Sequence, residues 1–283
     1  MIRSAALPLT IVATAILCLP GTRTAAAQDA SAWDKEAHAA ARLIAGTANK
    51  SGDATWLRAA IEIRLDPGWK TYWRSPGDSG VPPTLDFSGS ENVKSVTVLW
   101  PPPQRFPDGA GGNSIGYFGH IILPLHVLPQ DAAKPPSVHL KLDYAVCGTL
   151  CVPAEANLAL SLSGNGAEDQ IITIVERRVP RKVALGAPGD LAIRAVHREA
   201  GGAHERVVVD VAAPEGMAVN LFVEGPTPEW SLPLPEPGGG TGPLRRFSFE
   251  LDGLPEGAQG KGALLTFTAV SGNDAIEVPV HLD

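Results

Sequence analysis

Residues 144–153 read Tyr-Ala-Val-Cys-Gly-Thr-Leu-Cys-Val-Pro, which places Cys147 and Cys151 four residues apart. The flanking residues are poor helix formers, and Pro153 cannot continue a helix because it lacks a backbone N–H. We therefore predict that the two cysteines face each other across a tight β-hairpin. Gly148 is expected to supply the unusual backbone dihedrals of its loop. Directly opposed cross-strand neighbours lie within reach of a disulfide.

The residues alone leave two uses open for this cysteine pair. Closing so small a ring removes little entropy from the unfolded chain, about 2 kcal/mol before any strain is subtracted. A structural clip would therefore do better between distant strands, whereas a short-range bridge is the kind that is easily reduced. A clip and a redox-active pair both stay open at this point. A metal site is disfavoured because the histidines are scattered without zinc-like spacing, and we expect no cofactor.

The N-terminus predicts export. Arg3 is followed by an apolar stretch too short to span a membrane, and residues 24–27 read Thr-Ala-Ala-Ala, as a signal peptidase requires. We expect residues 1–27 to be a cleaved signal peptide. Its removal takes Cys18 away and leaves the hairpin pair as the remaining cysteines of an exported protein, in a compartment where disulfides persist.

Charge and hydropathy limit the classes of partner. The formal net charge is −7, which gives no reason to expect nucleic acid or an anionic membrane as a partner. No later stretch of the sequence reaches transmembrane length, so we expect a chain that does not itself span a membrane.

The periodicity predicts an all-β protein of two domains. In the first, residues 28–165, apolar residues alternate at Ile61, Ile63 and Leu65, and short strands bounded by turn residues suggest a β-sandwich. Strands are expected over residues 56–65, 93–100, 121–127, 138–146 and 156–162. The segment from Asp34 to Ile44 is ambiguous between a helix and the approach to a first strand.

A connecting segment and a second sandwich-like domain follow. Residues 166–185 are expected to be a linker with a short helix from Asp169 to Val179, with Asp169 as its N-cap. Residues 186–283 again show strand patterns, but no cysteine and no chemical motif. We expect a smaller β-sandwich with a structural or docking role. Its strands are predicted over residues 191–196, 206–211, 218–223, 246–251, 263–270 and 276–281.

An ordered set of motifs precedes the cysteines. Residues 68–83 read Gly-Trp-Lys-Thr-Tyr-Trp-Arg-Ser-Pro-Gly-Asp-Ser-Gly-Val-Pro-Pro; the later motifs are Trp-Pro-Pro-Pro-Gln-Arg-Phe at 100–106, Gly-Tyr-Phe-Gly at 116–119 and Leu-Pro-Leu at 123–125. With the cysteine pair, this set resembles the N-terminal periplasmic domain of DsbD-type and ScsB-type thiol:disulfide interchange proteins over roughly residues 33–163. The resemblance implies an immunoglobulin-like β-sandwich and a part in the relay of reductant, as a protein-disulfide reductase component.

The resemblance also implies roles for individual residues. Cys147 and Cys151 would be the redox pair, with Cys151 bonding to partners and Cys147 resolving. A cap loop built from Phe106, Pro107 and Asp108 would cover the disulfide, although an ordinary flexible glycine loop explains the same residues. The residues expected to support the pair are Tyr72, Tyr117, Tyr144 and Pro153. We interpret Trp73 as a core aromatic.

The implied partners are a membrane-embedded thiol electron donor and periplasmic disulfide-containing proteins, including thioredoxin-fold proteins. Relatives continue into a membrane domain and a thioredoxin-like domain, and this sequence has neither, so we expect the donor to be a separate protein. The alternative hypothesis is a non-catalytic periplasmic binding or assembly protein, such as a copper-stress or cytochrome-maturation accessory, in which the disulfide is structural.

Overall fold

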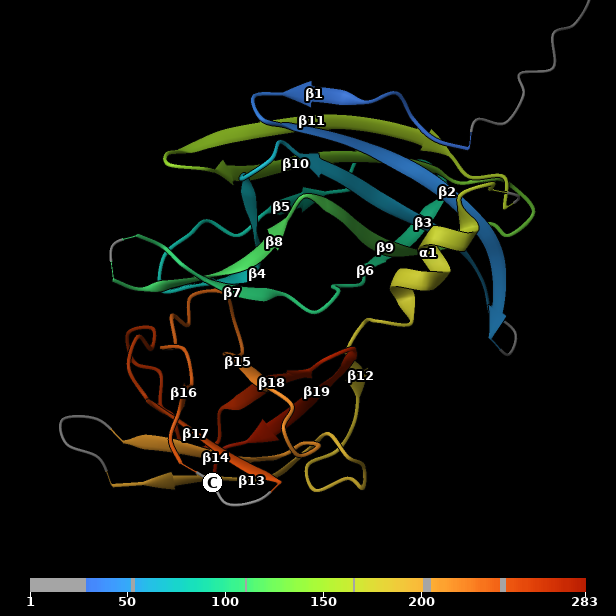
Figure 1. Cartoon of the computed structure of the whole chain (residues 1–283). Helices are drawn as coiled ribbons and strands as arrows, with labels where there is room; N and C mark the ends of the chain where they lie inside the picture. The colour runs from blue at the N-terminus through green and yellow to red at the C-terminus, as the bar shows by residue number, and fades with distance from the viewer. Residues whose placement is uncertain (1–28, 52–53, 110, 165, 201–204, 240–242) are drawn as a thin grey trace, which may run out of the picture.

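The computed structural model describes residues 29–51, 54–109, 111–164, 166–200, 205–239 and 243–283. The predicted signal peptide and Cys18 lie outside the described residues, so cleavage and export stay predictions. Over the described ranges, no helix is long and apolar enough to cross a membrane. Two β-sandwiches follow one another along the chain and lie one above the other in Figure 1.

The first sandwich consists of two antiparallel sheets. Its strands are β1 (Asp34–Glu36), β2 (Ala39–Ser51), β3 (Ala54–Leu65), β4 (Lys70–Gly77), β5 (Thr84–Asp86), β6 (Val93–Val98), β7 (Gln104–Pro107), β8 (Asn113–Phe118), β9 (His120–Pro129), β10 (Ser137–Cys147) and β11 (Cys151–Ser161). Sheet 1 has the order β1-β2-β3-β9-β6. Sheet 2 has the order β11-β10-β4-β8-β7, and β5 pairs with β10. The cysteines therefore lie in sheet 2.

Alternating side chains from both sheets meet in one core. Ile61, Ile63 and Leu65 of β3 are buried there, as their spacing in the sequence predicts. Trp73 of β4 is 1% exposed in the same core, which confirms its interpretation as a core aromatic. Since β4 anchors itself through Trp73, the residues on either side of it are held in register on the opposite face of sheet 2.

The ambiguous N-terminal segment is extended. Asp34 to Glu36 form β1, the chain turns at Ala37 with φ of 48°, and β2 begins at Ala39. The helical alternative is therefore wrong for this segment. The segment is extended because its apolar residues alternate, so that Ala41, Leu43 and Ala45 of β2 all point into the core.

Sheet 2 contains strands that the sequence patterns did not predict, β4 and β8 among them. Both carry residues that usually interrupt strands, Pro76 and Gly77 in β4 and Gly116 in β8. Gly116 is required by packing, because a β-carbon there would lie 1.9 Å from the carbonyl oxygen of Thr71. Close approach of β8 to β4 explains this glycine.

Helix α1 (Asp169–Glu176) packs on the outer face of sheet 1. Its buried residue Ile172 lies against Ile44 and Ile122 in a small apolar cluster. The sequence suggested Asp169 as the N-cap of this helix, but Glu168 holds that position. The Asp169 carboxylate instead accepts hydrogen bonds from the backbone N–H and hydroxyl of Thr47 and from Arg58. Asp169 therefore ties the helix to the first sandwich.

The second sandwich has two further sheets around its own core, and its strands pair antiparallel except for β12, which pairs with β19 in parallel. Its strands are β12 (Arg181–Lys182), β13 (Ala192–Glu199), β14 (Arg206–Ala212), β15 (Asn220–Glu224), β16 (Glu236–Pro237), β17 (Leu244–Glu250), β18 (Leu264–Ser271) and β19 (Asp274–His281). Sheet 3 has the order β12-β19-β18-β15, and sheet 4 has the order β13-β14-β17-β16. The predicted second set of strands is present, which confirms an all-β fold.

The two sandwiches are joined by apolar and ionic contacts. Phe222 of β15 is fully buried in the core of the first sandwich, with its ring centroid 5.8 Å from that of Trp73. Beside it, Arg74 of β4 binds Glu224 of β15 and Glu277 of β19. The strand that carries Trp73 and Arg74 is therefore held by both sandwiches.

Candidate functional site

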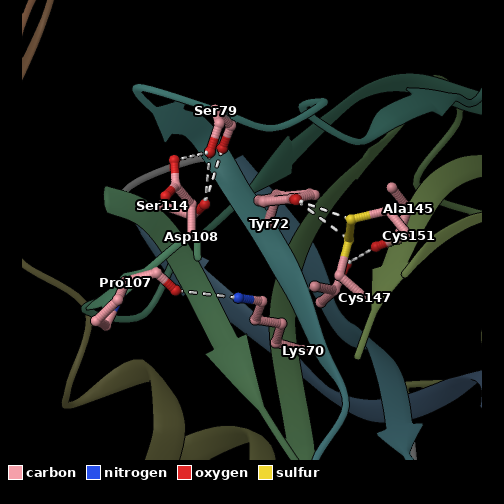
Figure 2. Close-up of a disulfide and its surroundings, with 10 residues drawn as sticks. Lys70, Tyr72, Ser79, Pro107, Asp108, Ser114, Ala145, Cys147 and Cys151 are labelled. Atoms are coloured by element: carbon pink, nitrogen blue, oxygen red, sulfur yellow. Dashed lines mark hydrogen bonds between the residues drawn. A yellow bond between two sulfur atoms is a disulfide. The ribbon is translucent and has the colours of Figure 1, made fainter. Parts of the chain in front are cut away.

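The two cysteines face each other across a hairpin, on either side of its loop, as predicted. Cys147 ends β10, Cys151 begins β11, and the two residues are directly paired with their Cα atoms 4.0 Å apart. Their sulfurs form a disulfide (Figure 2). The loop between them is closed by a hydrogen bond of 3.0 Å from the N–H of Gly148 to the carbonyl oxygen of Leu150.

Gly148 serves a different purpose from the one expected. It is not among the glycines with a positive φ in the described residues, so the loop does not need its conformational freedom. A β-carbon at this position would lie 3.1 Å from the indole ring of Trp69. The requirement is therefore one of space, because the loop packs on Trp69, which in turn stacks on His38.

The two cysteines differ in their exposure to solvent. Strand β10 lies between β11 and β4, and Cys147 at its end is 1% exposed. Strand β11 is the edge of sheet 2, and Cys151 is exposed. An incoming thiolate can therefore reach Cys151 directly, whereas Cys147 is covered.

The side chain that covers Cys147 is Tyr72. Its hydroxyl oxygen lies 3.1 Å from the Sγ of Cys147 and 3.4 Å from the Sγ of Cys151. Disulfide sulfurs carry no hydrogen, so the Tyr72 hydroxyl is the donor in these contacts. In Figure 2 the phenol of Tyr72 reaches from β4 toward both sulfurs. Register explains this, because Lys70 pairs with Cys147 and Tyr72 lies two residues further along the same face.

A polar cluster and a turn hold Tyr72 from the other side. A β-carbon at Gly80 would lie 2.6 Å from the Tyr72 ring, so the turn packs directly on it. The hydroxyl of Ser79 donates to Asp108 over 2.8 Å, and the hydroxyl of Ser114 donates to the carbonyl oxygen of Ser79 over 2.9 Å. Burial raises the pKa of Tyr72, a hydrogen bond with Ser114 opposes the rise, and the charge of Asp108 adds to it. The phenol therefore keeps its proton at neutral pH.

The three cap-loop residues lie to one side of the disulfide. Strands β4 and β8 separate β7, which carries Phe106, from β10. The Phe106 ring packs edge-on against Phe118, with centroids 5.0 Å apart, and the Lys70 ammonium lies 4.3 Å above it. Lys70 also donates to the carbonyl oxygen of Pro107 over 3.4 Å. A cap role for Phe106, Pro107 and Asp108 stays a prediction, and in this structure the aromatic group on the sulfurs is Tyr72.

Of the other predicted supporting residues, two are buried in the core and one is exposed. Tyr117 is buried in the core and donates to the carbonyl oxygen of Pro101 over 2.8 Å; burial raises the pKa of Tyr117. Tyr144 is also in the core, and burial, with the charges of Glu36 and Asp34, raises the pKa of Tyr144 to about 12. Pro153 is exposed. Both tyrosines thus remain neutral, and neither takes the position that Tyr72 has on the sulfurs.

Four neighbours of the site, Lys70, Ser79, Gly80 and Ser114, were not singled out as site residues from the sequence. Residues 76–80 read Pro-Gly-Asp-Ser-Gly, which indicates a turn and nothing more. The signal that could have found Lys70 is the alternation around Tyr72, since the two residues must share a face if the segment is a strand.

Comparison with known proteins gives a consistent result. Residues 40–163 match the family described as thiol:disulfide interchange protein DsbD, N-terminal. No curated protein sequence matches the chain. Among solved structures, the chain is similar to the N-terminal periplasmic domain of ScsB from Proteus mirabilis, with 21% sequence identity and a TM-score of 0.70. That likeness covers 90% of this chain and 98% of the other, so it extends over both sandwiches. Residues 40–163 therefore correspond to a DsbD-type N-terminal domain; they form most of the first, immunoglobulin-like sandwich and carry the Cys147–Cys151 disulfide.

Proposed function

We propose that this protein performs thiol:disulfide interchange through Cys147 and Cys151, taking electrons from a donor dithiol and passing them to protein disulfides. One observation carries the proposal. An exposed cysteine, Cys151, is bonded to a buried one, Cys147, and the hydroxyl of Tyr72 lies 3.1 Å from the Sγ of Cys147. The exposed cysteine offers a point of attack, and the buried one is equipped to leave.

Reduction of the domain proceeds in two steps. A donor thiolate attacks the Sγ of Cys151, a donor–Cys151 bond forms, and the Cys147–Cys151 bond breaks with its electron pair on Cys147. The second thiolate of the donor then attacks the donor sulfur of this mixed disulfide and releases Cys151 as a thiolate. The donor leaves with a disulfide, and the domain has gained two electrons and, from solvent, two protons.

Delivery to a substrate reverses these roles. The Cys151 thiolate attacks a substrate disulfide, one substrate thiolate leaves, and Cys151 is joined to the other substrate sulfur. The Cys147 thiolate then attacks Cys151, restores the internal disulfide and releases the second substrate thiolate. Cys151 bonds to partners and Cys147 resolves, in agreement with the roles that the family resemblance implies.

Tyr72 acts on the sulfur that changes charge. Burial disfavours a thiolate at Cys147, since desolvation penalises the charged form. A protonated phenol that donates to this sulfur offsets part of that penalty, and a better stabilised leaving thiolate departs faster. Tyr72 is therefore proposed as a positioning and hydrogen-bonding residue, while Ser79, Ser114 and Asp108 support its ring from the side.

The partners and the location belong to the same proposal. The match to a thiol:disulfide interchange family supports two kinds of partner. The proposed electron donor is a membrane-embedded thiol protein, and the proposed recipients are periplasmic disulfide proteins, including thioredoxin-fold proteins. The similar structure is described as a periplasmic domain of ScsB, and residues 1–27 of this chain have the composition of a signal peptide. Both observations support the periplasm.

The reduction potential of the disulfide tests the proposed function. We expect it to lie above about −300 mV, because exchange-active disulfides have higher potentials than structural ones. The purified protein is equilibrated with dithiothreitol or glutathione buffers of defined ratio, and free thiols are trapped by alkylation and counted by mass. A potential well below this value would contradict the proposal and favour the alternative hypothesis, a binding protein with a structural clip.

A Tyr72→Phe variant is expected to react with a small thiol about tenfold more slowly than the unmodified protein. The substitution removes one hydrogen bond to a developing thiolate, worth about 1.5 kcal/mol, and each 1.36 kcal/mol corresponds to a factor of ten in rate. The rate of disulfide reduction by dithiothreitol is followed at fixed pH. The matched control is Tyr117→Phe, which loses a hydrogen bond to Pro101 away from the sulfurs. Equal rates for both variants would remove Tyr72 from the mechanism.

A further inference from the structure

A groove lies beside Cys151 on sheet 2. Ala145 and Pro153 of the hairpin line it together with Val81 and Pro82, which belong to the segment between β4 and β5. Val81 is 61% exposed, and Pro82 and Pro153 are exposed as well. Apolar side chains left open beside an accessible disulfide sulfur are typical of a surface that a partner covers.

The rim of this groove is acidic. Glu36, Asp143 and Glu155 all line it. Lys141 is the cation beside them, 3.7 Å from Asp143 and 3.6 Å from Glu155. These ion pairs are about half exposed and therefore weak. Three carboxylates against one ammonium leave the rim with a net charge of −2.

The position of Cys151 restricts what can occupy the groove. In the proposed mechanism the sulfur of Cys151 bonds to the partner's sulfur. The residues that flank the partner's cysteine in the chain are therefore brought against the groove during that step. The carboxylates of the rim attract positive charge in those flanking residues, and Val81, Pro82 and Ala145 offer them apolar contact.

We propose that this groove, which we call the Cys151 groove, binds a cationic polypeptide segment with apolar residues next to its reactive cysteine. The inference rests on the proposed function and adds the chemistry of the partner to it. Anionic thiols are disfavoured by the same carboxylates, so the groove selects among partners that are equally able to reduce a disulfide. Charge complementarity of this kind acts mainly on the association rate and weakens with salt.

Peptide thiols of matched length test the Cys151 groove. The probes are acetylated and amidated pentapeptides with the sequences Lys-Leu-Cys-Leu-Lys, Gln-Leu-Cys-Leu-Gln, Glu-Leu-Cys-Leu-Glu and Lys-Gly-Cys-Gly-Lys. Each rate of reaction with the Cys147–Cys151 disulfide is divided by the rate of the same peptide with hydroxyethyl disulfide, which removes differences in thiol reactivity. At low salt we expect the Lys-Leu peptide to react about tenfold faster than the Glu-Leu peptide, with the Gln-Leu peptide between them.

Variants of this chain assign the preference to the rim. Asp143→Asn with Glu155→Gln is expected to reduce the charge preference to about twofold, and Lys141→Gln is expected to increase it. The control, Glu215→Gln with Glu256→Gln, makes the same change in net charge at exposed positions of the second sandwich and should leave the preference unchanged. Val81→Ser should reduce the advantage of the Lys-Leu peptide over the Lys-Gly peptide. A preference that survives moderate salt would contradict an electrostatic origin.

The outcomes separate this inference from the function on which it rests. If all four peptides reduce the disulfide at equal normalised rates, the partner preference is wrong and the redox function stands. If the preference persists in the Asp143→Asn/Glu155→Gln variant, the groove is the wrong site. If neither the peptides nor dithiothreitol reduces the disulfide under native conditions, the proposed function is wrong, and the partner preference with it.

Discussion

A Cys147→Ser variant is expected to form mixed disulfides readily, whereas a Cys151→Ser variant is expected to form them about 100-fold more slowly. The reason is the unequal exposure of the two cysteines. Cys151 is exposed on an edge strand, and Cys147 is 1% exposed beneath Tyr72. A reagent reaches Cys147 only after local opening, and an opening that costs about 3 kcal/mol slows the reaction about 100-fold.

The reaction of each single-cysteine variant with dipyridyl disulfide measures this difference, because the released thione is followed by its absorbance. The same reaction in denaturant is the control, where both variants should react at the same rate. Under native conditions, equal rates would contradict the proposed division of roles, and a faster reaction at Cys147 would reverse it. With a disulfide-containing substrate protein, only the Cys147→Ser variant should accumulate a mixed disulfide, because Cys151 displaces one substrate thiolate and the thiolate that would resolve the complex is absent.

The hairpin was predictable because its determinants are local. Pro153 excludes a helix, and the pairing of Cys147 with Cys151 follows from a loop of only three residues. The alternation of Ile61, Ile63 and Leu65 likewise depends on nearest neighbours in sequence. Most of the long strands have such local patterns, and for these strands the structure confirms the sequence-based predictions.

The surroundings of the disulfide were less predictable because they depend on contacts between distant residues. Tyr72 lies on the sulfurs only because β4 pairs with β10 in the register that places Lys70 opposite Cys147. Strand β4 was obscured by Pro76 and Gly77, which usually indicate a turn. Phe106 was expected over the disulfide from the family resemblance, but sheet order places its strand beyond β4 and β8.

The second sandwich illustrates a different limit. Its strands were predicted from their patterns, yet nothing in its sequence indicated a chemical role. Packing explains why three consecutive apolar residues occur in β15, namely Leu221, Phe222 and Val223. The two neighbours fill the core of the second sandwich, whereas Phe222 points the other way, into the core of the first. The contact between the two sandwiches is visible only when both cores are known, and a docking role for the second sandwich stays a prediction.

An Arg74→Met variant is expected to lower the free energy of unfolding by about 3 kcal/mol, the low end for breaking a buried ion pair. Arg74 donates two hydrogen bonds of 2.8 Å to Glu224 and one of 2.6 Å to Glu277. Burial would lower the pKa of the Arg74 guanidinium, but its bonds to the two carboxylates outweigh burial and raise it. Without Arg74, the partly buried carboxylates face each other without this cation between the sandwiches.

Urea denaturation followed by fluorescence and by circular dichroism measures the loss. The control is Arg181→Met, which removes an exposed ion pair with Asp274 and is expected to cost less than about 1 kcal/mol. Replacing Glu224 and Glu277 by Gln in the Arg74→Met background should recover part of the stability, because no unpaired charge is then left in the interface. Equal losses for the Arg74 and Arg181 variants would mean that the ions between the sandwiches are as well solvated as those on the surface. The large difference that we expect would instead make the second sandwich a support for β4, the strand that holds Tyr72 against the disulfide.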